Sequence, residues 1–435
     1  MTEPADEPTV SGRAAYGSVA AQWWACAVLT LVYGCHAIDR NMPNILLEPI
    51  RHEFKLSDSQ LGAFTGFAYA ISFSLTVLPV GWITDRVNRR NFLAAIIVGW
   101  SAFTALSGMA RSYLHLVAAR VGIGVTESGA APAAMSMITD IFPERQRGRA
   151  LGLFYISQAL GQLVAGTVGG FVAATYGWRA AFLIAGVPGL ILAVVMLTTI
   201  REPRRGGAEA AEHVGVAPKV HEVFQFLWRT PGLVVLILGC ACLGMINLSI
   251  AAWLGSFFIR IHHLDLKQAG LVLGLASGLG AMVGAPLQGW LSDRLQGLNR
   301  RWPLWLVAIA STISMIAGFW MLFTGSVVVA IVCIIIGDLC RMGYAPPTYS
   351  LFMTRTPPRL RGAAMSIMQL TTNVFGFAIG PVFVGVLSDY YGGGTSLRFA
   401  MAWAIGFTAV VVVLMLLATR LLFGTKAQPV VAAAS

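Results

Sequence analysis

The chain has 435 residues, of which 57% are hydrophobic and only 11% are charged, and its formal net charge is +11. Soluble domains carry about 25% charged residues, so this composition, with a mean hydropathy of +0.72, excludes an ordinary soluble protein. Nucleic-acid binding is also excluded as the reason for the positive charge, because the basic residues gather in short connections between long apolar runs.

Apolar runs of the length that a helix needs to cross a bilayer, about 20 residues, recur from Ala21 to Phe423. We therefore predict an all-α polytopic membrane protein with twelve transmembrane helices, at about 20–45, 57–84, 91–110, 112–142, 147–175, 179–200, 231–261, 266–292, 302–324, 326–355, 362–390 and 397–422. Polar stretches divide the chain into an N-terminal tail (1–19), a first six-helix bundle (20–200), a linker (201–224), a second six-helix bundle (225–422) and a C-terminal tail (423–435).

Most of the Lys and Arg residues fall in connections on the side of the first tail, as in Arg86, Arg89 and Arg90 after the second span. The positive-inside rule then places both termini in the cytoplasm. The first tail lacks the basic start and the cleavage site of a secretory signal, so we expect the first span to be retained.

The second span ends in Gly81-Trp-Ile-Thr-Asp85-Arg86, and the eighth ends in Gly289-Trp-Leu-Ser-Asp293-Arg294. The repeat continues upstream in the same register, from Gln60, Gly62 and Gly66 to Gln268, Gly270 and Gly274. It resumes where Gly129-Ala-Ala-Pro132 matches Gly343-Tyr-Ala-Pro346. A match over this length indicates an internal duplication of about half the chain.

Twelve spans in two parallel halves are typical of the major facilitator superfamily. The run Gly81-x-x-x-Asp85-Arg86-x-x-Arg89-Arg90 resembles that superfamily's signature loop between spans two and three. Asn88 stands where the family usually has Gly; Asn tolerates a left-handed backbone better than most residues, so we expect the turn to survive.

A narrower resemblance is to bacterial-type members of the spinster family of lysolipid and sphingosine phosphate transporters. It is carried by Asp39-Arg40 in span one and by Arg120-Val-Gly-Ile-Gly-Val-Thr-Glu127 in span four. Sugar-acid and aromatic-acid symporters share parts of this pattern. The resemblance implies a protein of a bacterial-type inner membrane.

Six charged residues fall within predicted spans: Asp39, Arg40, Arg120, Glu127, Asp338 and Arg341. Each costs about 2.5–3.5 kcal/mol at a helix centre facing lipid, so they must face the interior, pair, or line a wet cavity. Arg120 and Glu127 share one helix face, and Asp338 is one turn from Arg341. The alternative is that these residues are structural pairs, which suits Asp338 and Arg341 best.

Spans one and four line the central cavity in the superfamily, so the resemblance places Asp39, Arg40, Arg120 and Glu127 in a site. Burial favours the neutral form of a carboxyl group and a nearby Arg favours the charged form. We therefore assign proton coupling to Asp39 and Glu127. Predicted substrate-binding residues are Arg40, Arg120, Arg341, Tyr33, Asn247, Trp253 and Tyr344. Each uncharged member of that set is equally consistent with packing in the core or against lipid, and His36 is expected to be a packing or pore-lining residue.

In the superfamily, the carboxylate matching Asp85 meets span eleven of the other half and holds the outward-facing state. The resemblance therefore predicts a conformational latch at Gly81, Asp85, Arg86, Arg90, Asp293 and Arg294. Topology alone suffices to explain Arg89 and Arg90. Glycines in spans two, five, eight and eleven are expected at close helix contacts. The segment Ala165–Gly170 resembles an antiporter motif except at Thr167, so antiport stays open.

The sequence predicts a secondary active transporter that works by alternating access and is coupled to protons. No phosphate-binding loop supports ATP drive, and no HExxH, GxSxG or metal-spaced His/Cys group supports an enzyme, a metal or a cofactor. Two Arg residues favour an anionic head group, and spans one, four, seven and ten are sparse in Asn, Gln and Ser. The expected substrate is a lysophospholipid or a sphingosine-phosphate-like lipid, carried by a monomer. The alternatives are a sugar-acid or aromatic-acid symporter, a drug or metabolite exporter, and a non-transporting sensor.

Overall fold

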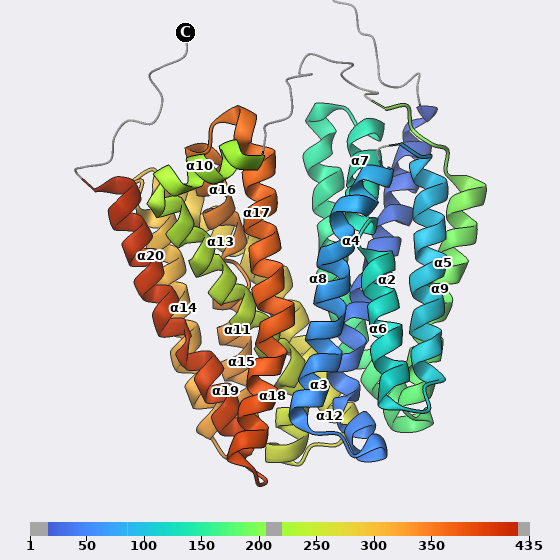
Figure 1. The fold of residues 1–435 in the computed structure, drawn as a ribbon, viewed down its shortest axis with the longest axis vertical. Helices are drawn as coiled ribbons and strands as arrows, with labels where there is room; N and C mark the ends of the chain where they lie inside the picture. The colour runs from blue at the N-terminus through green and yellow to red at the C-terminus, as the bar shows by residue number, and fades with distance from the viewer. Residues whose placement is uncertain (1–15, 85, 206–219, 425–435) are drawn as a thin grey trace, which may run out of the picture.

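The computed structural model describes residues 16–84, 86–205 and 220–424, and every element in them is helical. Asp85 and most of the predicted tails and linker lie outside these residues. The all-α prediction is confirmed. Two helical bundles stand side by side, with the N-terminal bundle in blue to green and the C-terminal bundle in yellow to red (Figure 1).

The elements of the N-terminal bundle follow the predicted spans, except that the first helix continues to Phe54, nine residues beyond the predicted end at 45. They are α2 (Val19–Phe54), α3 (Asp58–Gly62), η1 (Ala63–Phe67), α4 (Ala68–Thr84), α5 (Arg89–Gly108), α6 (Tyr113–Glu127), α7 (Ala130–Ile141), α8 (Glu144–Tyr176) and α9 (Trp178–Thr199). The elements α3, η1 and α4 form one continuous rod.

The C-terminal bundle repeats this order after a short helix. Its elements are α10 (Val220–Arg229), α11 (Pro231–His262), α12 (Leu266–Val272), η2 (Leu273–Ser277), α13 (Gly278–Gln296), α14 (Trp302–Phe323), α15 (Val327–Arg341), α16 (Ala345–Arg355), η3 (Pro358–Leu360), α17 (Arg361–Asn373), η4 (Val374–Ile379), α18 (Gly380–Tyr391), α19 (Ser396–Gly406) and α20 (Thr408–Phe423).

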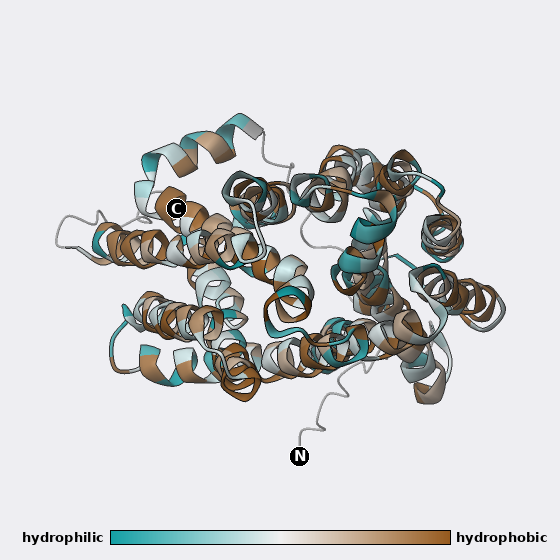
Figure 2. Cartoon of the chain, turned by 90° about the horizontal axis from the view of Figure 1, so that it is seen from below, coloured by the Kyte–Doolittle hydropathy of each residue, from teal (hydrophilic) through white to brown (hydrophobic). Residues whose placement is uncertain are grey.

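Ten helices among the described residues are long and apolar enough to cross a membrane. Two further rods complete the predicted twelve, one formed by α3, η1 and α4, and one by α6 and α7. Large apolar side chains such as Leu75 and Leu114, each 72% exposed, lie on the outside of the bundles. Seen along the long axis, hydrophobic stretches surround both bundles (Figure 2). Lipid, rather than water, suits such a surface.

The sequence repeat corresponds to a repeated local structure. Ser57 accepts a hydrogen bond from the backbone N–H of Gln60, and Asp265 accepts one from that of Gln268, so the repeated Gln is the third residue of a capping box in both halves. In each half this first turn runs into a π-helical segment, η1 or η2. The duplication therefore preserves both the start of the span and its irregular turn.

The two bundles meet through glycines. Gly166 of α8 faces Gly274 of α12 so closely that a Cβ atom on Gly166 would lie 2.5 Å from the Gly274 nitrogen. Gly62 faces α18 in the same way, since its Cβ atom would lie 2.5 Å from the Pro381 carbonyl oxygen. The close packing predicted for these glycines is confirmed. The segment that resembles an antiporter motif lies at this contact.

The bundles approach each other at one end only. We call the end where α2 begins and α20 ends the terminus face, and the end where α2 and α11 finish the far face. The bundles converge at the far face and separate toward the terminus face (Figure 1). The cross-bundle hydrogen bonds among the described residues lie at the far face, between α2, α3, α11 and α18.

Candidate functional site

A cavity of about 290 Å³ lies between the two bundles. Its N-terminal wall is polar throughout and consists of Arg40, Asn41, Asn44, Thr65, Gln158 and Gln162. Its C-terminal wall is largely apolar, with Leu248, Ala251, Ala252, Met342, Phe377 and Pro381, and adds the polar groups of Asn247, Tyr344, Thr372 and Asn373. The two bundles thus offer one hydrophilic wall and one mainly hydrophobic wall to the same space.

Arg40 is the charged residue of the cavity lining that the structure describes. Its guanidinium carbon lies 3.9 Å from the centre of the Phe377 ring and 5.7 Å from that of Tyr69. A smaller pocket beside the cavity is lined by Arg40 with Tyr69, Phe377 and Asn373. The cation therefore projects from the polar wall onto aromatic rings contributed by both bundles, at a point where a ligand can reach it.

Asp39, Arg120 and Glu127 lie behind the cavity wall, inside the N-terminal bundle. They are 2%, 2% and 1% exposed, and none of them lines the cavity. Arg120 Nη1 is 3.4 Å from the backbone carbonyl oxygen of Asp39, to which it donates. The four residues predicted to form one site are thus divided between the cavity wall and a buried cluster behind it.

Glu127 faces His36 rather than an arginine. Glu127 Oε2 is 3.4 Å from His36 Nε2, and the His36 ring stacks on Tyr33 at 5.2 Å between centroids. His36 is therefore a packing residue, as expected, and also the nearest basic side chain to the buried acid. Helical spacing alone did not indicate this pair, because His36 and Glu127 lie on different spans.

Asp338 and Arg341 form the local ion pair that their spacing predicts. Both are buried, and Arg341 Nη1 also donates to Asn247 Oδ1 at 2.7 Å. Asn247 lines the cavity, so Arg341 reaches the cavity through the amide that it orients. This geometry is the structural pairing that the sequence left open as an alternative.

The three aromatic residues of the predicted site have different surroundings. Tyr344 lines the cavity. Tyr33 stacks on Phe154 with centroids 4.1 Å apart. Trp253 is fully buried, and its Nε1 donates to the Pro381 carbonyl oxygen at 2.9 Å. Tyr33 and Trp253 therefore support the helices around the cavity, whereas Tyr344 forms part of its wall.

Sequence reasoning missed most of the amides that line the cavity. Gln158 and Gln162 come from span five and Asn373 from span eleven, while the expectation of few Asn and Gln residues concerned spans one, four, seven and ten. Span one itself contributes Asn41 and Asn44. The cavity is richer in amides than expected, because spans five and eleven contribute amides to it in addition to those of spans one and seven.

Among the predicted latch residues that the structure describes, Arg86, Arg90 and Arg294 contact their own bundle. Arg86 lies 3.7 Å above the Trp82 ring, the backbone N–H of Arg90 donates to Glu202 Oε2 at 2.8 Å, and a Cβ atom at Gly81 would meet open space. In the second copy, Arg294 lies 5.6 Å from the Trp290 ring beside Asp293. The latch residue Asp85 lies outside the described part of the chain.

Two interpretations of this loop are corrected. Asn88 has φ −65° and ψ 112° instead of a left-handed conformation, and its side chain accepts from the backbone N–H of Asn91 as the N-cap of α5. Arg89 is only 2% exposed and donates to Glu202 Oε1 at 2.8 Å and to Asp140 Oδ2 at 2.5 Å. Topology is therefore an incomplete explanation of Arg89, which ties α5 to α7 and to the end of α9.

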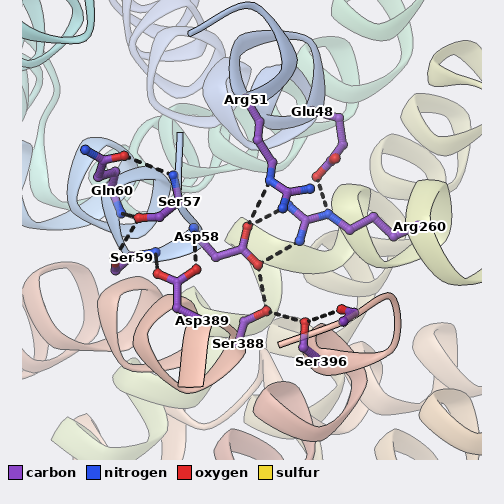
Figure 3. Close-up of polar contacts among 11 residues, drawn as sticks. Glu48, Arg51, Ser57, Asp58, Ser59, Gln60, Arg260, Ser388, Asp389 and Ser396 are labelled. Atoms are coloured by element: carbon purple, nitrogen blue, oxygen red, sulfur yellow. Dashed lines mark hydrogen bonds and ion pairs between the residues drawn. The ribbon is translucent and has the colours of Figure 1, made fainter. Parts of the chain in front are cut away.

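The far face carries a network that the sequence did not indicate (Figure 3). Arg260 of α11 donates to Glu48 Oε1 of α2 at 2.7 Å and to both carboxylate oxygens of Asp58 at 2.7 and 2.8 Å. Ser388 and Asp389 of α18 bind Asp58 and its neighbour from the other side. We call Glu48, Asp58, Arg260, Ser388 and Asp389 the far-face cluster.

The far-face cluster joins the two bundles; the acids that pair with Arg260 are buried, whereas Asp389 at its edge is exposed. Glu48 and Asp58 are 4% and 3% exposed, so their ion pairs with Arg260 are screened little by solvent. The paired residues are far apart in the sequence and belong to different bundles, so the contact holds the two bundles together at the far face. Nothing in the sequence indicated that Arg260 pairs with Glu48 and Asp58.

Comparison with known proteins agrees with this architecture. The family model described as Major Facilitator Superfamily matches residues 29–381. The chain is 28% identical over 367 residues to an MFS-type efflux pump of Mycolicibacterium smegmatis, with 84% of each protein covered. It is 24% identical over 387 residues to the sphingosine-1-phosphate transporter SPNS2 of Danio rerio, covering 84% of this chain and 76% of that protein.

The fold is also similar to that of a solved structure. A bacterial homologue of the human lysosomal transporter Spinster, in an inward-facing and unoccupied conformation, matches with a TM-score of 0.85 and 24% identity. The match covers 95% of this chain and 100% of the other.

Proposed function

The chain belongs to the major facilitator superfamily and is an integral membrane transporter, and from this premise we propose that it moves an amphipathic organic anion by proton-coupled alternating access. The observation that carries the proposal is the two-walled cavity, in which Arg40 supplies the cation and the opposite wall is mainly apolar. The proposed substrate class is a lysophospholipid or a sphingosine-phosphate-like lipid.

The head group of such a substrate suits the N-terminal wall. A guanidinium group binds a carboxylate or phosphate through two parallel hydrogen bonds, and the Phe377 ring 3.9 Å away holds the Arg40 cation in place. Asn41, Asn44 and the two glutamines offer further hydrogen bonds to head-group oxygens. The aliphatic part of the substrate would then lie against Leu248 and its neighbours on the C-terminal wall.

Proton coupling is assigned to Asp39 and Glu127. Both carboxyl groups are almost fully buried, and burial favours the neutral form of an acid. Asp39 adjoins Arg40 on α2, so a substrate anion bound to Arg40 and a proton on Asp39 would be held by consecutive residues. The proposed link between substrate binding and proton movement is that the charge of Asp39 and the binding of an anion to the neighbouring Arg40 affect each other.

The closed far face and the separated terminus face define the state of the transporter. With the termini in the cytoplasm, as the positive-inside rule predicts, this state is inward-open. Rocking of one bundle against the other around the central cavity would open the far face, and the ion pairs of the far-face cluster would have to separate for that to happen.

A hydrophilic organic acid is the second candidate substrate. It is favoured by the cavity amides of Asn41, Asn44, Gln158, Gln162, Asn247 and Asn373, since a sugar acid needs many hydrogen-bond partners for its hydroxyl groups. Export of the substrate and import remain alternative directions, as the similarity to an efflux pump illustrates.

The test is uptake into proteoliposomes under an imposed pH gradient, with an anionic lysolipid and a short sugar acid as competitors. We expect pH-dependent flux that the lysolipid inhibits at lower concentration. Stronger inhibition by the sugar acid would reverse the substrate class and leave the transporter assignment intact. Binding of either compound without flux would instead support a non-transporting sensor.

A further inference from the structure

The far face carries a third copy of the motif that is duplicated at the terminus face. The rod of η4 and α18 ends in Gly385-Val-Leu-Ser-Asp389, with the same spacing of Gly and Asp as Gly81–Asp85 and Gly289–Asp293. Each of the first two copies lies at the end of a span, and both of these spans run from the far face to the terminus face. The rod that ends in α18 runs in the opposite direction, so its copy lies at the far face (Figure 1).

Asp389 binds the start of span two across the bundle interface (Figure 3). Its Oδ1 accepts from the backbone N–H of Asp58 at 2.9 Å, and its Oδ2 accepts from that of Ser59 at 2.8 Å. The first N–H groups of a helix have no partner within the helix. In the continuous rod of α3, η1 and α4, Ser57 supplies one partner, to Gln60, and the other bundle supplies the carboxylate for Asp58 and Ser59.

Two other residues of the third copy also contact the start of span two. A Cβ atom on Gly385 would collide with the Asp58 carbonyl oxygen, so the approach requires glycine. Ser388 Oγ donates to Asp58 Oδ2 at 2.6 Å. Gly385, Ser388 and Asp389 therefore all contact Asp58 or Ser59, which are the first two residues of span two. The whole motif, and not its acid alone, fits this one contact.

We propose that Asp389 is a positioning residue of the transport cycle, which holds the start of span two against α18 and so keeps the far face closed. The family resemblance predicts the opposite role for Asp85, which would join the other end of span two to span eleven and hold the outward-facing state. The same two spans then carry one carboxylate contact at each end, and rocking of the bundles engages one while it releases the other. This inference rests on the alternating-access cycle of the proposed function.

A purely structural role would give a different result from a role in the cycle. If Asp389 only stabilised a local turn, its loss would lower stability without changing the distance between the bundles. If it positions span two, its loss must move the equilibrium toward a state with an open far face and a closed terminus face. The two faces must respond in opposite directions.

The experiment measures two distances by pulsed electron spin resonance in lipid nanodiscs. One spin-label pair, at Arg111 and Gly394, spans the far face between exposed loops of the two bundles. The other, at Gly148 and Gly362, spans the terminus face, where added side chains meet open space. Labelling of the six native cysteines is measured on the protein without introduced sites.

Asp389→Asn keeps the shape of the side chain and removes its charge. We expect the population with a long far-face distance to rise about fivefold, which corresponds to about 1 kcal/mol for a partly exposed charged contact, and the terminus-face distance to shorten. Ser59→Pro removes one N–H donor that has no partner within the helix, together with the Ser59 hydroxyl that lies 2.8 Å from that of Ser57, so it should produce a smaller change in the same direction. This second variant leaves all charges in place.

Asp293→Asn is the matched control, because it removes the acid of the second copy at the terminus face. It should leave the far-face distance closed. The inference is overturned if Asp389→Asn and Ser59→Pro both keep the wild-type distances, or if Asp293→Asn opens the far face equally. Since no substrate is used, absence of flux with every anion would defeat the proposed function without changing this result.

Discussion

In the C-terminal bundle, Asp338 and Arg341 form a buried ion pair one helical turn apart, whereas in the N-terminal bundle Arg120 donates to a backbone carbonyl and Glu127 faces His36. The repeat aligns Glu127 with Arg341, so corresponding positions carry opposite charges. In the C-terminal half the acid and the base pair with each other on one helix, whereas in the N-terminal half the charged residues have partners on different helices. We expect only the acids of the second arrangement to change their protonation when the helices move, which is why proton coupling is assigned to them.

The largest expected effect is a loss of stability when the ion pair of Asp338 and Arg341 is broken. Asp338→Asn removes the carboxylate charge and leaves the Arg341 charge buried with only uncharged amides as partners, which should cost about 3–5 kcal/mol of stability. Denaturation in mixed detergent and SDS measures this loss. The double variant Asp338→Leu with Arg341→Met should recover most of it, since apolar replacement of a whole buried pair is often neutral. A single variant as stable as the wild type would show that the pair is not structural.

The acids of the N-terminal bundle should affect coupling instead. Asp39→Asn and Glu127→Gln are each expected to bind substrate and to reduce pH-driven uptake at least about tenfold, equivalent to about 1.4 kcal/mol. Binding is measured by substrate-induced thermal stabilisation and uptake in proteoliposomes. The double variant of the C-terminal pair is the control and should keep its pH dependence. If both acid variants retain the wild-type response to pH, the assignment of proton coupling to the N-terminal bundle is wrong.

The next effect concerns Arg40, the cation that reaches the cavity. Arg40→Lys keeps the charge and loses the planar fork that binds an anion through two hydrogen bonds, so the substrate dissociation constant should rise about fivefold to tenfold, or about 1–1.4 kcal/mol. Isothermal titration with an anionic lysolipid measures the change. Arg111→Lys, in an exposed loop of the far face, should leave the constant unaltered. Equal weakening by both variants would point to general electrostatics.

The sequence predicted what depends on local spacing. Span number, the duplication and the contact of Asp338 with Arg341 follow from apolar length, register and helical geometry. The partners of Glu127 did not follow, because the rotation of one helix against another is set by packing over the whole bundle. The pairing of Arg260 with Glu48 and Asp58 was missed for a further reason, since it depends on how the two bundles pack against each other. The cavity amides of Gln158, Gln162 and Asn373 were missed because spans five and eleven also reach the cavity.

The smallest expected effect lies in the duplicated loops, where the two halves are most alike in sequence and are expected to differ in effect. Asp85 follows the second span and Asp293 the eighth, and the resemblance makes Asp85 the principal contact to the other bundle. Asp85→Asn should shift the resting population toward the state with an open terminus face by a few fold, because a partly exposed charged contact contributes only about 1 kcal/mol. The rate at which an impermeant thiol reagent modifies Gln162→Cys, at the cavity wall, reports the opening.

Asp293→Asn should act in the same direction and more weakly, since the loop from Arg294 to Arg301 is longer than its counterpart. Unchanged modification rates in both variants would remove the latch role from this motif. Equal rates in the two variants would instead make the halves equivalent at this face, and the asymmetry between the bundles would then be confined to the charges buried inside them.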